Sequence, residues 1–400
     1  MRWLALILFT LIFTCVPVVY GIEDISSPDE VVLEAEPLRD ELEKMGIDTM
    51  PSNSDVAHEK TLKEKLEDIY KLEVTDTSVN NYLLTDIVTK HFDKSIIESI
   101  HPFAGYNGQV SMNFNEKDSF QSKYGFNVMV AGVDGKFRDS KSDFRVLLSY
   151  SPLSSRNMLR SAFSDVYIGT NAIPHHRLQV GYQRPAAGVE GKISAFQIPF
   201  LYRSQISRNF GTVRKIGARI IGDYDLIDYD IGLFDSDTYM KSFFSGAEFD
   251  GWVNIKPLGK TDGKYGNLKL GSGIQSGHRD IGYTVVGAYA NYEYKNFTAN
   301  FEWADADGYN GYSGHVSNNK ASGFYTTLAY KITPKVQILA RYDEFDPNKN
   351  IKGNKMREYS VGINWFIKGQ GLRLIFNYVF CQNDSAKDSH RLMIGTQILL

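Results

Sequence analysis

Five cationic side chains gather in one polar stretch of the sequence, residues 183–214. They are Arg184, Lys192, Arg203, Arg208 and Arg214, and the single acid among them is Glu190. Guanidinium groups stay charged at any physiological pH and bind oxyanions through planar forks of N–H donors. In a narrow, partly dehydrated passage such groups lower the entry barrier for anions and raise it for cations. The stretch therefore predicts a basic constriction, provided that the rest of the chain builds a passage around it.

The elements that must hold this stretch are predicted from a period-two pattern that begins at Phe103. In residues 359–367 the odd positions are large and apolar, and the even positions are mostly small or polar. Residues 372–380 repeat the pattern, with Leu372, Leu374, Phe376, Tyr378 and Phe380 on one face. Residues 336–342 repeat it again. Strands of nine to eleven residues that alternate in this way are typical of transmembrane β-barrels.

The connections between these strands distinguish a barrel from a soluble sandwich. Short turns fall at 223–225, 295–296, 333–334 and 369–370, whereas long polar stretches fall at 183–213, 235–245, 305–320, 345–356 and 382–388. A barrel threaded through a membrane from one side has short turns at one end and long loops at the other. We therefore predict an all-β, transmembrane antiparallel barrel of about sixteen strands, wide enough to leave an aqueous channel.

Composition agrees with a barrel. The chain has 24 Tyr, 24 Phe and 34 Gly, yet its mean hydropathy is only −0.29. Such a balance is expected where alternate residues face lipid and aromatic girdles mark both interfaces. Apart from the N-terminal segment, no stretch approaches eighteen consecutive apolar residues, which excludes a helical membrane protein.

The same alternation predicts which charges face the interior. Arg145, Lys215, Arg219, Arg341 and Arg373 are the candidate pore-wall cations. Lys256 and Lys331 point inward as well, and so do the acids Asp228, Asp230, Glu302, Asp343 and Glu358. Part of this charge is therefore expected to pair across the lumen. The alternative interpretation is that these are the solvating charges of any water-filled barrel.

The N-terminal quarter has a different character. Residues 1–21 contain Arg2 and an apolar run from Leu4 to Val19, and they predict a cleavable signal peptide. Residues 22–100 hold 20 Asp and Glu against 8 Lys and Arg, whereas residues 101–400 hold 27 against 35. We predict an acidic periplasmic linker with helical patterns at 58–73 and 82–100, followed by the barrel domain at 101–400. A plug or a cell-wall tether is the alternative role for residues 22–100.

Four short motifs carry a resemblance to the phosphate-selective porin O/P family of outer-membrane porins. They are residues 132–136 (GVDGK), residues 178–185 (LQVGYQRP), residues 229–234 (YDIGLF), and the ending from Tyr359 through Asn377 and Tyr378 to Gln397. The resemblance covers roughly residues 103–400. It implies a sixteen-stranded, trimeric barrel whose third extracellular loop folds inward to narrow the pore, and the loop at 183–214 is the corresponding segment.

The chain departs from the family pattern at two places. Members often have an arginine-rich run before the Gly-Val-x-Gly-Lys stretch, and here that run is Asn127-Val128-Met129-Val130. The last residue is Leu400, where many outer-membrane proteins end in an aromatic residue. The family thus implies a porin for small anionic or neutral solutes, but this wall lacks the arginines that favour phosphate.

Other constellations are weaker. His175, His176 and His390 have no further metal ligands at a useful spacing, and Asp305-Ala306-Asp307-Gly308 lacks the later ligands of a calcium loop. No catalytic motif appears, so we predict no catalytic site, cofactor or metal, and no nucleic-acid partner. The predicted partners are outer-membrane lipids, small solutes and two further copies of the chain. A structural or adhesive barrel, or an enzyme on the barrel rim, remains the rival function.

Overall fold

The structure is a computed structural model that describes residues 89–115, 121–139, 141–150, 162–211, 213–238, 244–311 and 316–400. The predicted signal peptide, the acidic linker and the helical pattern at 58–73 lie outside these residues. No helix in the described ranges is long and apolar enough to cross a membrane.

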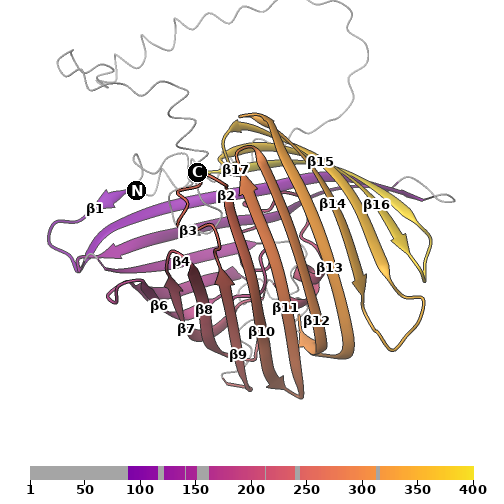
Figure 1. The fold of residues 1–400 in the computed structure, drawn as a ribbon. Helices are drawn as coiled ribbons and strands as arrows, with labels where there is room; N and C mark the ends of the chain where they lie inside the picture. Colours follow the sequence, from indigo (N-terminus) through magenta and orange to yellow (C-terminus); the bar gives the residue numbers. More distant parts are fainter. Residues whose placement is uncertain are drawn as a thin grey trace, which may run out of the picture. The chain divides into compact units, whose positions relative to one another are not determined.

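Seventeen strands and one short helix make up the described part of the chain (Figure 1). They are β1 (Lys90–His91), β2 (Ile97–Asn115), β3 (Gln121–Phe137), β4 (Ser142–Tyr150), β5 (Phe163–Thr170), β6 (His176–Gln183), α6 (Gln205–Phe210), β7 (Lys215–Asp223), β8 (Ile227–Asp235), β9 (Ala247–Ile255), β10 (Asn267–Arg279), β11 (Ile281–Tyr294), β12 (Phe297–Asn310), β13 (Val316–Thr333), β14 (Val336–Asp346), β15 (Met356–Lys368), β16 (Leu372–Asn383) and β17 (Ser389–Leu399).

Strands β2 to β17 form a closed antiparallel barrel. Each strand pairs with its neighbours in sequence, and β17 returns to pair with β2 from Ser389↔Asn115 to Leu399↔Gly105. The predicted sixteen-stranded barrel is therefore confirmed. Closure removes the open sheet edges that cannot exist in lipid, because each strand of the barrel has a hydrogen-bonded neighbour on both sides.

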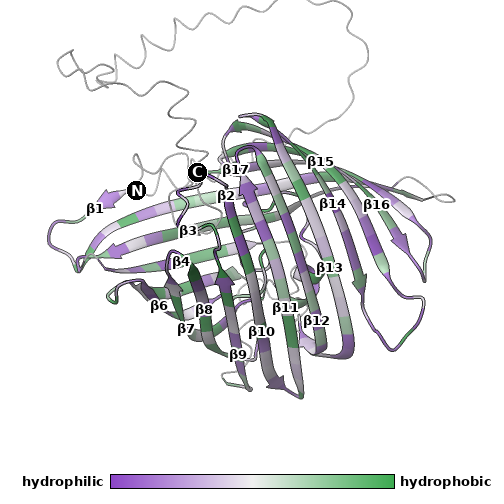
Figure 2. Ribbon diagram, viewed as in Figure 1, coloured by the Kyte–Doolittle hydropathy of each residue, from purple (hydrophilic) through white to green (hydrophobic). Residues whose placement is uncertain are grey.

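The predicted alternation is visible along the strands as a change between hydrophobic and hydrophilic residues (Figure 2). On β15, Tyr359, Val361, Ile363 and Trp365 are between 42% and 54% exposed on the outer surface, whereas Asn364 on the inner face is fully buried. The outer face is thus apolar and accessible to lipid, and the polar positions point into the barrel.

The connections follow the predicted rhythm with two exceptions. We call the end with turns at 295–296, 334–335 and 369–371 the turn end, and the opposite end the loop end. Asp280 alone joins β10 to β11 at the loop end, with a positive φ of 61°, whereas residues 256–266 make a long connection at the turn end. The strands also extend into the predicted loop 305–320, as far as Asn310 and from Val316.

The helix predicted at 82–100 is wrong for the residues that the structure describes. Residues 90–91 and 97–100 are strand, and β1 pairs with β2 through Lys90↔Ile100 and His91↔Ser99. The reason is tertiary, since β17 ends opposite Gly105 and leaves the adjoining edge of β2 without a partner. Strand β1 supplies the missing backbone hydrogen-bond groups there. Phe92 and Ile96 lie in the connection between the two strands and Ile97 begins β2, so their helix-like spacing does not reflect a helix.

Candidate functional site

Residues 184–214 connect β6 to β7 and lie against the inner wall of the barrel; we call them the inner loop. A row of hydrogen bonds fixes its central part to three strands. The backbone oxygens of Ile198, Pro199 and Tyr202 accept from Arg373 (3.1 Å), Asn364 (3.0 Å) and Arg341 (3.3 Å), respectively. The backbone N–H of Leu201 donates to Asn377 Oδ1 at 2.9 Å, and that of Gln205 donates to Asp343 Oδ2 at 2.7 Å. The inward segment is thus bonded across β14, β15 and β16.

Apolar packing holds the same segment against the wall. Ile198, Phe200, Leu201, Ile206 and Phe210 are each at most 5% exposed. Ile206 and Phe210 pack with Ala306, Ala321, Tyr325 and Phe345, whereas Leu201 packs with Ile375, Val379 and Met393. Burying each large apolar side chain contributes about 1.5–3 kcal/mol relative to leaving it in water. Small inward residues on β12 and β13, such as Ala306 and Ala321, leave the space that the loop fills.

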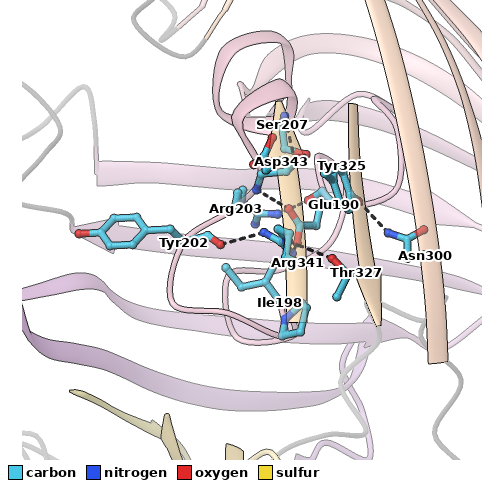
Figure 3. Close-up of polar contacts among 12 residues, drawn as sticks. Glu190, Ile198, Tyr202, Arg203, Ser207, Asn300, Tyr325, Thr327, Arg341 and Asp343 are labelled. Carbon is cyan, nitrogen blue, oxygen red and sulfur yellow. Dashed lines mark hydrogen bonds and ion pairs between the residues drawn. The ribbon is translucent and has the colours of Figure 1, made fainter. Parts of the chain in front are cut away.

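Two buried carboxylates hold the loop in place, Glu302 of the wall and Glu190 of the loop itself, and Figure 3 shows Glu190 beside Arg341. Glu302 on β12 accepts from the backbone N–H groups of Val189 (3.1 Å) and Glu190 (3.4 Å), and from the hydroxyl of Tyr325 (2.7 Å). Glu190, the single acid of the loop, forms an ion pair with Arg341 of β14 and accepts from the backbone N–H of Ser204 at 2.6 Å. Both carboxylates are at most 4% exposed. The loop is therefore held by charge as well as by packing.

Gly188 allows the contact with Glu302. Its φ is +63°, and a Cβ built on it would collide with Glu302 Oε1. A left-handed backbone angle is inexpensive for glycine and costly for residues with a side chain. This position thus lets the chain approach the carboxylate closely enough for the next two N–H groups to bind it.

The short helix α6 lies at the end of the bonded segment. Ser204 caps it, with its hydroxyl accepting from the N–H of Ser207. Arg208 in its last turn pairs with Glu358 of β15 at 3.0 Å, and Arg214 pairs with Asp165 of β5 at 2.7 Å. These two of the five predicted loop cations are therefore neutralised by wall acids.

The other three loop cations have no such partner. Arg184 and Arg203 both donate to the backbone oxygen of Ile193, so their guanidinium groups lie close to each other. Neither of them, nor Lys192, forms an ion pair with a carboxylate of the described residues. The net positive charge of the inner loop is consequently concentrated on Arg184, Lys192 and Arg203.

Burial lowers the pKa of each of these three side chains, and neighbouring carboxylates oppose part of this effect. Burial, followed by the charges of Arg214 and Arg203, lowers the pKa of Arg184. Burial likewise lowers the pKa of Arg203 to about 10 and lowers that of Lys192 below its usual value. A counter-anion near these groups would raise their pKa values, because an opposite charge within a few ångströms favours the charged form.

The predicted wall cations point inward, but most are buried rather than exposed to a passage. Arg145 (9% exposed), Lys215 (0%) and Arg341 (6%) form ion pairs with Asp134, Glu248 and Glu190. Arg373 is 1% exposed and bonds to the inner loop and to Gln397. Arg219 is less buried and lies 3.3 Å from Asp230. These ion pairs join nearby strands, or a strand and the inner loop, rather than opposite sides of the lumen, so the residues hold the wall and the loop together.

Sequence reasoning missed the residues that seat the loop. The alternating pattern marks Asn364 and Asn377 only as polar positions of their strands, and Glu302 only as a wall charge. The available signal was the inward-facing run of small or apolar residues on β12 and β13, since a water-filled lumen has no need of Ala306, Ala321 or Tyr325. Within the described ranges, no group of three or more His, Cys, Asp or Glu side chains could hold a metal ion.

Comparison with known proteins finds a family match for the second half of this barrel. The family model for phosphate-selective porin O and P matches residues 259–399, a stretch that contains β10 to β17. Residues 259–399 are thus similar to the phosphate-selective porin O and P family. The resemblance inferred from the motifs is confirmed there, and the family places the porin in the bacterial outer membrane. The inner loop precedes the matched region, so its chemistry must be judged from its own residues. No curated protein matches the chain by sequence.

Solved structures share the fold at low identity. An anion-selective porin from Comamonas acidovorans superposes with a TM-score of 0.56 at 11% identity, covering 75% of this chain and 99% of that one. OprB of Pseudomonas putida gives 0.57 at 10%, covering 75% and 94%. The outer membrane channel DcaP of Acinetobacter baumannii gives 0.54 at 10%, covering 78% and 99%. At these identities the likeness establishes the porin barrel and nothing finer.

Proposed function

We propose that this porin lets small hydrophilic solutes diffuse passively across the outer membrane and that it prefers anions. The observation that carries the preference is the distribution of charge on the inner loop. Two of its five cations form ion pairs with wall acids, and Glu190, the one acid of the loop, forms an ion pair with Arg341 of the wall. Arg184, Lys192 and Arg203 therefore keep their charge for passing solutes, and they attract anions over cations.

The preference is tested by reversal potentials in planar bilayers under a potassium chloride gradient. The wild-type porin is expected to be anion-selective, and the triple variant R184Q/K192Q/R203Q is expected to lose most of that selectivity. The matched control is the double variant R208Q/E358Q, which removes a neutralised pair and leaves the net charge unchanged. Cation selectivity of the wild type, or equal selectivity of the triple variant, would refute the assignment.

We further propose that the chain is not an enzyme and that it works as a homotrimer. The match to a porin family supports the first proposal. A trimeric form of OmpT from Vibrio cholerae, which shares the barrel with a TM-score of 0.52 at 14% identity, supports the second. Native mass spectrometry of the refolded barrel measures the oligomeric state. A stable monomer that conducts normally would contradict the trimer.

A further inference from the structure

A row of exposed lysines marks one rim of the barrel. Lys260 and Lys264 lie between β9 and β10, Lys295 between β11 and β12, Lys335 between β13 and β14, and Lys368 ends β15. We call these five residues the basic rim. All five are exposed at the turn end, and none forms an ion pair with any described residue. Asp262 is the one acid within the same turns.

The opposite ends of the same strands are different. Lys320, Lys355 and Arg357 pair there with Asp307 (3.1 Å), Glu344 (2.8 Å) and Asp384 (2.8 Å), and Lys349 pairs with Asp305. Cations at the loop end are thus largely neutralised by neighbours, whereas those of the basic rim are left to interact with something outside the chain. The asymmetry belongs to one arc of the barrel, from β10 to β16.

The lipid boundary passes next to the basic rim. Exposed apolar side chains lie within three residues of four of the lysines: Tyr265 (56% exposed), Phe297 (37%), Ile332 (55%) and Trp365 (47%). Lys264 lies 5.3 Å from the ring centre of Tyr265, and Lys295 lies 5.0 Å from that of Tyr294. Aromatic rings with lysines beside them are typical of the membrane–water interface, where the ammonium group reaches the level of the headgroups.

We propose that the basic rim binds the phosphate groups of anionic phospholipids in the periplasmic leaflet of the outer membrane. The inference rests on the proposed membrane function, because it needs the turn end to face the periplasm. Lysine is a compact point charge that suits a phosphodiester without requiring a shaped pocket. Five lysines spread over four turns fit several lipids arranged along the barrel surface better than one ligand in a cleft.

The experiment compares lipids retained by the full chain after refolding into phosphatidylethanolamine vesicles that contain phosphatidylglycerol. Mild detergent extraction followed by native mass spectrometry gives the ratio of the two lipids on the barrel. At low salt, one lysine near the membrane surface raises the local concentration of anionic lipid by up to roughly fivefold. The wild type is therefore expected to be enriched severalfold, and the variant with all five lysines replaced by Gln is expected to return to the ratio of the vesicle.

The matched control replaces Lys320, Lys349, Lys352, Lys355 and Lys387 by Gln, which changes the net charge equally at the loop end. It is expected to keep the enrichment. Equal enrichment in all three proteins, equal loss in both variants, or full displacement of the lipid by inorganic phosphate would overturn the proposal. Single-channel conductance is measured on the same samples. A rim variant that still conducts is folded, and a wild type that does not conduct refutes the proposed porin function independently of the lipid result.

Discussion

Replacing Glu190 by Gln should release the inner loop from the barrel wall. Glu190 is 2% exposed and Arg341 is 6% exposed, so the change leaves a buried guanidinium without its counter-charge. Removing one partner of a buried ion pair costs about 3–5 kcal/mol. At about 1.4 kcal/mol for each factor of ten, the ratio of seated to displaced loop falls at least roughly 100-fold.

Single-channel recording measures this change directly. The wild type is expected to show one steady conductance level, and E190Q is expected to show frequent transitions to a wider level. The barrel itself is expected to stay closed, because its strand pairing does not involve the loop. D307N is the matched control, since Asp307 and Lys320 form an exposed pair worth about 0–1 kcal/mol.

A second variant separates the buried charge from the shape of the side chain. E190Q/R341M removes the guanidinium that E190Q leaves without a counter-charge. We therefore expect the double variant to show fewer transitions to the wider conductance level than E190Q alone. A steady E190Q channel identical to wild type would refute the reasoning. So would a double variant that is no steadier than the single one.

Three further predictions concern the same loop. G188A should lower the temperature at which the barrel unfolds in detergent, because the new Cβ meets Glu302 at a positive φ, a strain of about 1–3 kcal/mol. The unfolding is followed as a shift in electrophoretic mobility. An unchanged unfolding midpoint would contradict this prediction. N377A should leave the buried N–H of Leu201 without its partner, at a cost of about 1–3 kcal/mol, and increase protease cleavage within residues 184–214 but not elsewhere. Burial lowers the pKa of Lys192, so its charge is present at lower pH and is lost as pH rises through that value. Anion selectivity should therefore fall at a pH below the usual lysine range, and K192Q should lack this step.

Local patterns were sufficient to predict the barrel. Strands such as 372–380 alternate so regularly that the sequence alone shows which residues form their outer faces. The bounds of the inner loop are also within one residue of the prediction. The period-two rule works because lipid and lumen impose opposite demands on successive residues. The helical spacing fails at residues 90–100, where β1 exists only because a distant strand ends early.

Charge pairing could not be predicted, since the partners are far apart in the chain. Arg208 and Glu358 are 150 residues apart, and Glu190 and Arg341 are 151 apart. Type and spacing identified all five loop cations but could not say which ones the wall neutralises. Reducing them to Arg184, Lys192 and Arg203 required the fold.

The seam between β2 and β17 also sets the order in which this porin can be assembled. Asn115 pairs with Ser389, so the barrel cannot close until nearly the whole chain has crossed into the membrane. The inner loop is synthesised early, but the side chains that seat it come from β12 to β17. The passage is consequently narrowed only after the last strands have inserted. A chain cut short before β14 would have neither a closed wall nor a seated loop, and so it could not form a leaky pore of native width.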